Sequence, residues 1–309
     1  MTRATPRACL AALVFAGATL AAETEPQCSG GPGSPEVMIK GCTRLIEFAA
    51  LERSQLAQAY FTRGTHWGTL ANHDRAIADF TMAIELDPKL AGAHFNRALA
   101  YSEKDDHAAA VADYDAALRL SPREARAYIG RAVEWTLLGE YARAAADYEQ
   151  AMRLQPESFN AYFGRGRARF YAGDFLGAAS DFLRAHRLDA SIDTALWIFL
   201  ARKHADIPGE QTLAQEAGTS GEGEWPSAVV GLYLGRFAPD AVLNAASHAD
   251  ARTQRERRCE ALFHIAQWQM LRGARAAASE GFRETQGACP KSYVEYEGAV
   301  AALRALQKP

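Results

Sequence analysis

A period of 34 residues is the feature that most constrains this chain. Proline recurs at Pro88, Pro122 and Pro156. When the sequence is laid out in lines of 34, with residue 57 at position 1, small residues align at positions 8, 20 and 27, and aromatic residues align at position 24. Position 8 is Gly64, Ala98, Ala132 and Gly166, and position 20 is Ala76, Ala110, Ala144 and Ala178. Position 27 is Ala83, Ala117, Ala151 and Ala185, and position 24 is Phe80, Tyr114, Tyr148 and Phe182. Such a period predicts a helical repeat array.

Each line predicts two helices joined by a tight turn, at about residues 57–70 and 74–86 in the first repeat. Small side chains at positions 8, 20 and 27 let the two helices approach closely. Proline after the second helix ends it. One hairpin cannot bury its own apolar face, so the hairpins are expected to stack into a curved solenoid with a concave inner groove.

These residues resemble the tetratricopeptide repeat family over four consecutive repeats, in residues 54–190. Further aromatic residues at positions 4 and 11 carry the resemblance: Tyr60, Tyr128, Tyr162, Trp67, Tyr101 and Trp135. The fourth repeat departs from the pattern, with Arg169 at position 11 and Ala190 in place of the closing proline. The resemblance implies an all-α solenoid that binds other proteins or peptides and is not an enzyme.

Arginine and aspartate recur together in the repeats, sixteen residues apart. Position 7 is Arg63, Arg97, Arg131 and Arg165, and position 23 is Asp79, Asp113, Asp147 and Asp181. Because these positions lie on the first and second helix of each hairpin, the pattern predicts an ion pair across each hairpin, bidentate where the geometry allows. The alternative is a basic row that binds a ligand.

The N-terminal residues have the layout of a secretory signal peptide. Arg3 and Arg7 precede an apolar run from Ala8 to Leu20, and small residues follow to Ala22. The run is shorter than a membrane-spanning helix. We therefore expect cleavage of residues 1–22 and a soluble periplasmic or secreted protein without a transmembrane segment. The alternative is an apolar N-terminal helix of a cytosolic protein.

Four cysteines remain after the leader, which allows three pairings. Cys28–Cys42 would close a Gly/Pro-rich loop onto a helix from Pro35 to about Arg53, forming an N-terminal cap in residues 23–53. Cys259 and Cys289 fall at positions 1 and 31 of a further repeat-like hairpin, 259–290, and these ends meet in an antiparallel hairpin. Geometry therefore favours these two disulfides. A metal site is the rejected alternative, since no CxxC or suitable histidine spacing occurs.

The C-terminal part, residues 191–309, predicts a degenerate helical lobe. One helix is expected from Ser191 to Lys203, followed by a flexible, Gly-rich connector at 207–224. Short helices then follow Trp225 and run from about Pro239 to His248, before the repeat-like hairpin. Ser292 is expected to cap a last helix that ends near Gln307 and covers the open end of the array.

This order resembles the NlpI family of bacterial periplasmic tetratricopeptide repeat lipoproteins. The resemblance is carried by the four repeats and by the segments LWIFLARK (196–203), WPSAVVGLYLG (225–235), ALFHIAQWQMLRGARAAASEGF (261–282) and YVEYEGAVAAL (293–303). It implies a homodimeric adaptor that brings cell-wall endopeptidases together with a periplasmic protease. This chain departs from the family in its four disulfide cysteines and in having no cysteine in a lipidation context after the apolar run.

Positions 2, 5, 6 and 9 of the first helix in this repeat type face the groove. The candidate partner-binding residues are an apolar ladder of Phe61, Phe95, Ile129 and Phe163, together with Asn96, Arg126, Asn160 and Arg167. Exposed aromatics with a few directional polar groups suit the capture of an extended or helical peptide. The alternative is that the position-5 aromatics only pack neighbouring repeats together.

Composition and motifs exclude several other classes. The chain has 34 basic and 37 acidic residues, a net charge of −3, which argues against a nucleic-acid binder. No GxSxG or HExxH motif occurs, so no enzyme, cofactor or metal is expected. Two other roles stay open at this point. They are assembly through the convex face or a dimer surface, and direct binding of peptidoglycan by exposed aromatics.

Overall fold

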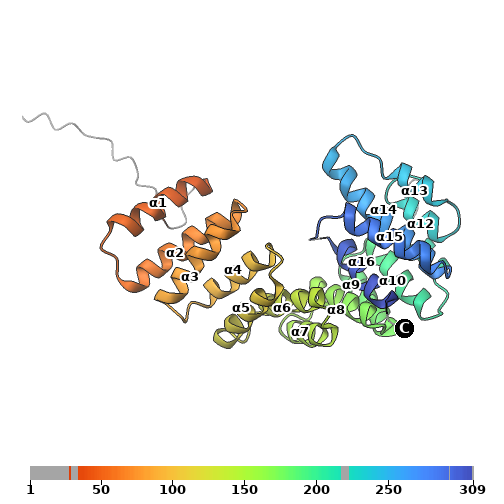
Figure 1. Cartoon of the computed structure of the whole chain (residues 1–309). Helices are drawn as coiled ribbons and strands as arrows, with labels where there is room; N and C mark the ends of the chain where they lie inside the picture. Colours follow the sequence, from red (N-terminus) through yellow and green to blue (C-terminus); the bar gives the residue numbers. More distant parts are fainter. Residues whose placement is uncertain (1–27, 29–33, 217–222, 292, 308–309) are drawn as a thin grey trace, which may run out of the picture.

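The computed structural model describes residues 28, 34–216, 223–291 and 293–307. The predicted leader at 1–22, and Ser292, lie outside the described residues. The four repeats form consecutive helical hairpins in an elongated, curved array (Figure 1). Their helices are α2 (Arg53–Thr69) with α3 (His73–Leu86), α4 (Ala91–Ser102) with α5 (His107–Leu120), α6 (Ala125–Leu138) with α7 (Tyr141–Leu154), and α8 (Phe159–Ala172) with α9 (Phe175–Leu188). The predicted all-α solenoid is confirmed.

The turn inside each hairpin has a local cause. Position 15 adopts the left-handed conformation in all four repeats, as Ala71, Asp105, Gly139 and Gly173. The next residue caps the second helix: the side chains of Asn72, Asp106 and Asp174 each accept a hydrogen bond from the backbone three residues on. This cap satisfies an amide that the helix itself cannot pair.

Small residues allow the close helix packing that the period predicts. The alanines at position 20 are fully buried, and those at position 27 are at most 3 % exposed. A Cβ atom added at Gly64 would lie 2.9 Å from the ring of Phe80, and one added at Gly166 would lie 2.6 Å from the ring of Phe182. The position-24 ring therefore packs directly on the position-8 backbone.

Each hairpin carries the predicted bidentate ion pair. In the second repeat, Arg97 Nε donates to Asp113 Oδ2 at 2.7 Å and Nη2 donates to Oδ1 at 2.8 Å. The other three pairs have the same geometry, with N–O distances of 2.6–2.8 Å: Arg63–Asp79, Arg131–Asp147 and Arg165–Asp181. The aspartates are 3–6 % exposed. The prediction is confirmed, and these arginines are committed to structure.

The third nitrogen of each arginine reaches the preceding helical layer. Nη1 donates to Thr43 of α1 (Pro35–Phe48) from Arg63, to Thr81 from Arg97, to Asp115 from Arg131 and to Glu149 from Arg165. One side chain thus closes its own hairpin and ties it to its neighbour. The pairs form a continuous ladder along the array.

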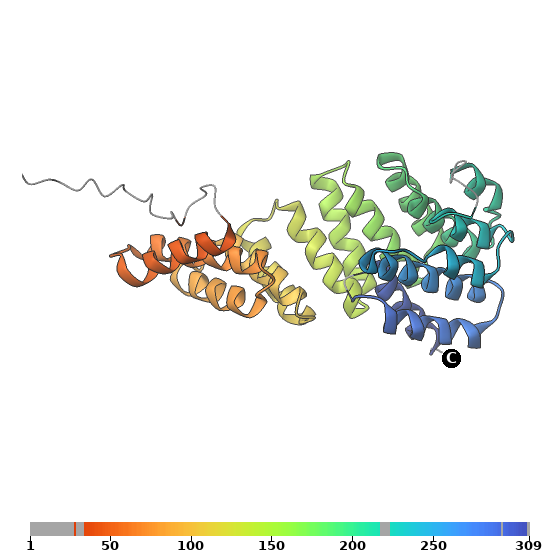
Figure 2. The same ribbon diagram turned by 90° about the horizontal axis from the view of Figure 1, so that it is seen from above.

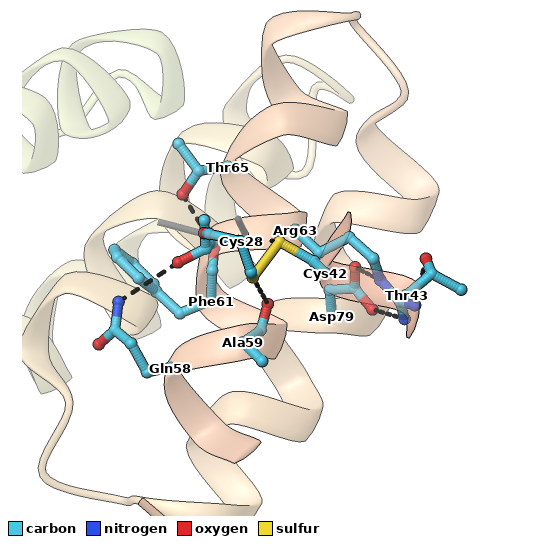
Figure 3. The surroundings of a disulfide bond; sticks show 10 residues. Cys28, Cys42, Thr43, Gln58, Ala59, Phe61, Arg63, Thr65 and Asp79 are labelled. Carbon is cyan, nitrogen blue, oxygen red and sulfur yellow. Dashed lines mark hydrogen bonds and ion pairs between the residues drawn. A yellow bond between two sulfur atoms is a disulfide. The ribbon is translucent and has the colours of Figure 1, made fainter. Parts of the chain in front are cut away.

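The N-terminal cap differs from the prediction in one boundary. The expected helix from Pro35 to about Arg53 ends at Phe48, because Ala49 is extended. Glu52 then begins α2 with a capping box, in which its backbone amide donates to Gln55 at 3.0 Å. Cys28 and Cys42 form a disulfide. Figure 3 shows this bond against α2, where the Cys28 sulfur lies 3.8 Å from the Ala59 carbonyl oxygen.

The C-terminal lobe packs at the opposite end of the array from α1 (Figures 1 and 2). Its helices are α10 (Ile192–His204), α11 (Glu210–Glu216), α12 (Ser227–Tyr233), α13 (Pro239–Ala245), α14 (Ala251–Leu271), α15 (Arg275–Ala288) and α16 (Val294–Leu306). Cys259 and Cys289 join α14 to the end of α15 as a disulfide.

The sequence predicts a flexible connector or lid at 207–224 and leaves open whether it is ordered; residues 210–216 of it are a helix. They form α11, because Leu213 is buried in the lobe and two side chains of α10 hold the segment. Arg202 Nη1 donates to Thr212 Oγ1 at 2.9 Å, and Lys203 Nζ pairs with Glu210 at 2.8 Å. Residues 217–222 lie outside the described part of the chain.

One hydrophobic core crosses the predicted boundary between the repeats and the lobe. Trp197 of α10 packs against Phe170 and Phe182 of the fourth repeat and against Phe263 of α14, with ring centroids 5.4–5.7 Å apart. All four rings are at most 7 % exposed. The fourth repeat and the lobe are therefore one packed unit, although their sequence patterns differ.

Removing one rung of the ladder is expected to destabilise the protein strongly. Asp113→Ala leaves the half-buried guanidinium of Arg97 with only the Thr81 hydroxyl as hydrogen-bond acceptor and also removes the contact of Asp113 with His94, which together should cost about 2–4 kcal/mol of unfolding free energy. Urea unfolding followed by circular dichroism measures this cost. Glu284→Ala, which removes an exposed pair with Arg258, is the control and should cost less than about 1 kcal/mol. Equal costs would contradict a structural role for the ladder.

Removing the lobe disulfide is also expected to lower stability. The bond closes a sequence separation of 30 residues, so the double variant Cys259→Ser/Cys289→Ser should lose about 3–4 kcal/mol. The same urea titration tests it, with the reduced wild-type chain as a comparison. An unchanged unfolding midpoint would show that the lobe does not depend on this link.

Candidate peptide-binding groove

The first helices of the four hairpins, α2, α4, α6 and α8, line the concave face. The predicted position-5 ladder lies on this face and is half-buried rather than fully exposed. Its rings contact the position-24 rings of the same repeats: Phe61 lies 6.0 Å from Phe80, Phe95 lies 5.7 Å from Tyr114, and Phe163 lies 5.5 Å from Phe182. The ladder therefore packs the hairpins together, and only its outer part can meet a partner.

The polar candidates divide between exposed and internally bonded side chains. Arg126 is exposed; its guanidinium lies 5.6 Å from the centre of the Phe95 ring and pairs with Glu124 at 3.1 Å. Asn96 donates to Thr65 Oγ1 at 3.3 Å, across the joint between the first two repeats. Asn160 is exposed, and Ile129 is half-buried. These residues offer directional contacts along the open part of the groove.

The fourth-repeat end of the groove is closed by the C-terminal lobe. Arg167, predicted to face an open groove, is only 9 % exposed, and its Nη1 donates to Glu297 of α16 at 3.0 Å. Phe163 packs between Phe159 and Trp197, with centroids 5.4 and 6.2 Å away. The expectation of an open-groove position is wrong for Arg167, whose side chain is buried against α16, whereas Phe163 is half-buried beside Trp197 of α10.

Two further contacts join the lobe to the second and third repeats. Lys291, just before α16, pairs with Asp105 in the turn of the second repeat at 2.6 Å. Arg304, near the end of α16, donates to the backbone oxygen of Leu137 in the third repeat at 3.3 Å. A cavity of about 510 Å³ remains between these contacts, lined by residues of α4, α6, α8 and the start of α16.

The open end of the groove holds a second cavity, of about 210 Å³, between the first and second repeats. Its lining includes Thr65, Asn96 and the half-exposed Leu99, and Glu103 lines both this cavity and the larger one. Thr65, Leu99 and Glu103 are absent from the candidate residues predicted from the sequence. Thr65 and Leu99 occupy position 9, and Glu103 occupies position 13. Positions 5, 9 and 13 are four residues apart and lie on one side of the helix, so the spacing predicts a shared surface.

Buried and half-buried carboxyl groups gather where α16 meets α10 and α14. Burial and, to a smaller extent, the neighbouring carboxylates of Glu295 and Asp193 together raise the pKa of Glu260 to about 8. Burial likewise raises the pKa of Glu295 to about 7. Burial also raises the pKa of Glu297, which the charge of Arg167 opposes. Closure of the lobe therefore places ionisable acids in an apolar environment.

Other site types find no support in the part of the chain that the structure covers. Within residues 28, 34–216, 223–291 and 293–307, no three histidine, cysteine, aspartate or glutamate side chains gather as ligands of a metal ion. No helix within those ranges combines the length and apolarity that crossing a bilayer requires.

Comparison with known proteins identifies the repeats. Models described as tetratricopeptide repeat match residues 91–124 and 138–192. A tetratricopeptide repeat protein from Parabacteroides merdae is similar in structure, with a TM-score of 0.55 and 12% identity over 89% of this chain and 93% of that one. The protein YrrB, titled as having an unusual peptide-binding site, has a TM-score of 0.50 and 18% identity over 58% of this chain and 89% of that one. No curated protein matches the sequence.

Residues 91–124 and 138–192 are therefore similar to tetratricopeptide repeats, and the helical hairpins on either side of these matches continue the same solenoid. Repeats of this type generally mediate interactions with proteins or peptides, through surfaces that several stacked hairpins build together. The fold is typically that of a scaffold that holds other molecules.

Stability is expected to fall as the pH rises from about 5 to 8. Glu260 and Glu295 have folded-state pKa values near 8 and 7, above the ordinary value of 4.5, so the folded state binds more protons than the unfolded state in this range. Glu260→Gln removes one of these ionisations. The variant should be about 1–2 kcal/mol more stable than wild type at pH 8, and this gain should shrink at pH 5.

Thermal unfolding at the two pH values tests this expectation. Glu280→Gln is the matched control, because Glu280 is exposed on α15 and should leave both midpoints unchanged. A Glu260→Gln variant that loses stability equally at both pH values would show that ionisation of Glu260 does not lower the free energy of unfolding.

Proposed function

We propose that this protein is a periplasmic adaptor that holds segments of partner proteins in the open half of its groove, between α2 and α6. The observation that carries the proposal is the apolar cavity between the first two repeats. Leu99, which is 44 % exposed, lines this cavity beside the amide of Asn96, and the half-buried Phe95, with Arg126 over its ring, lies one helical turn before Leu99 on α4. A partly exposed apolar anchor with a polar rim is typical of protein-binding surfaces.

The resemblance to the NlpI family supports cell-wall endopeptidases and a periplasmic protease as the partners, and a homodimer as the assembly. Two cysteine pairs at disulfide distance suit an oxidising compartment such as the periplasm. In this proposal the C-terminal lobe is a structural part of the adaptor. It closes one end of the groove and leaves the other end for the partner.

The test is a pull-down from periplasmic extract with three forms of the oxidised chain from residue 23. Leu99→Lys places a charge in the groove cavity and should reduce the captured partners by roughly tenfold or more. Leu176→Lys is the matched control, because Leu176 is 62 % exposed on α9 and lines neither cavity. Mass spectrometry quantifies the proteins, and circular dichroism checks that each variant is folded.

Each result separates the proposal from its rivals. Endopeptidases or a protease retained by Leu176→Lys and lost by Leu99→Lys would support the adaptor and place its site. Equal recovery by all three forms would move the working surface to the convex face or the dimer. No specific protein, with the wild-type chain sedimenting on cell-wall sacculi, would favour a peptidoglycan-binding accessory.

A further inference from the structure

Glu103 is the charged residue of the groove that has no evident structural task. It lies at the C-terminal end of α4, is exposed, and lines both cavities. The corresponding position-13 residues of the other repeats are uncharged: Thr69, Leu137 and Tyr171. The negative end of a helix dipole disfavours a carboxylate at this point, where a cation would be stabilising.

The other charged residues that line the larger cavity are paired. Arg167 pairs with Glu297 at 3.0 Å, and Lys291 pairs with Asp105 at 2.6 Å. His107 lies 2.8 Å from Glu134, which is buried behind the cavity wall. Every basic group of the lining thus has an acidic neighbour. Glu103 is in no ion pair with any residue that the structure describes, so the lining has one carboxylate in excess.

An apolar recess lies directly beside this carboxylate. Leu99 precedes Glu103 by one helical turn, and both line the 210 Å³ cavity with Phe80 and Ala100. Leu99 is 44 % exposed. Gly68 forms part of the opposite wall, and no atom lies within 4 Å of the place where its Cβ would stand. The recess can therefore accept a ligand side chain.

From this juxtaposition we infer that the groove selects a peptide segment in which a large apolar residue lies next to lysine or arginine. The apolar side chain enters the recess between the first two repeats, and the basic group meets Glu103 at the mouth of the larger cavity. An ammonium or guanidinium there would neutralise the excess carboxylate and complement the helix dipole. This inference rests on the proposed function, because it specifies the ligand of the same groove.

The experiment is selection of a random dodecapeptide library, displayed on phage, against the oxidised chain from residue 23 and against its Glu103→Lys variant. Peptides enriched on the wild type should carry lysine or arginine within about four residues of a large apolar residue. Peptides enriched on Glu103→Lys should carry aspartate or glutamate at that place. Glu280→Lys makes the same charge change on α15 and should select the same peptides as wild type.

Fluorescence anisotropy with one enriched peptide tests the two halves of the site separately. Glu103→Gln should weaken binding about two- to fivefold, as expected for an exposed ion pair, with the difference vanishing at high salt. Gly68→Leu fills the recess and should weaken the same peptide at every salt concentration. Circular dichroism should show both variants to be folded.

Two outcomes would overturn the inference, and they leave the proposed function distinguishable. Selection of the same charge by wild type and Glu103→Lys would show that Glu103 does not read the ligand. The absence of any enriched peptide would show that the groove does not take short segments. In either case, loss of partner by Leu99→Lys in the pull-down would still support the adaptor.

Discussion

The bidentate pair between arginine and aspartate is the interaction on which the array depends. Each arginine donates hydrogen bonds from two nitrogens to the aspartate of its own hairpin and from the third nitrogen to the preceding helical layer. Intra-repeat geometry and repeat stacking are therefore set by one side chain. Because the carboxylates are nearly buried, both charges need their partner, and the ladder tolerates little variation in the spacing of the helices.

The ladder reduces the number of free charges on the concave face. The basic residues that recur in every repeat are paired within the ladder, so the charges left in the groove are few and do not follow the period. Arg126 and Glu103 are exposed there, while Arg167 is neutralised by Glu297. Under the proposed function, specificity comes from single residues that break the repeat pattern, such as Glu103.

The C-terminal lobe decides how much of the groove is open. Its core is continuous with that of the fourth repeat through Trp197, and α16 lies against α8. The cavity between the first and second repeats is lined only by residues of α2, α3 and α4 and by Glu103 among the described residues, with none from the lobe. The two ends of the array therefore differ. The fourth-repeat end packs against the lobe, whereas the other end has a recess lined by the half-exposed Leu99.

The sequence by itself determined the repeat period, the helical hairpins and the ion pairs across them. These contacts recur at fixed separations along the chain, so each is visible as a pattern. Only the tertiary structure decided which groove residues are free. The contacts Arg167–Glu297 and Lys291–Asp105 join residues 130 and 186 positions apart, outside any period. Because these contacts fall outside the period, the repeat pattern alone does not predict the burial of Arg167 or the packing of Trp197 on Phe163.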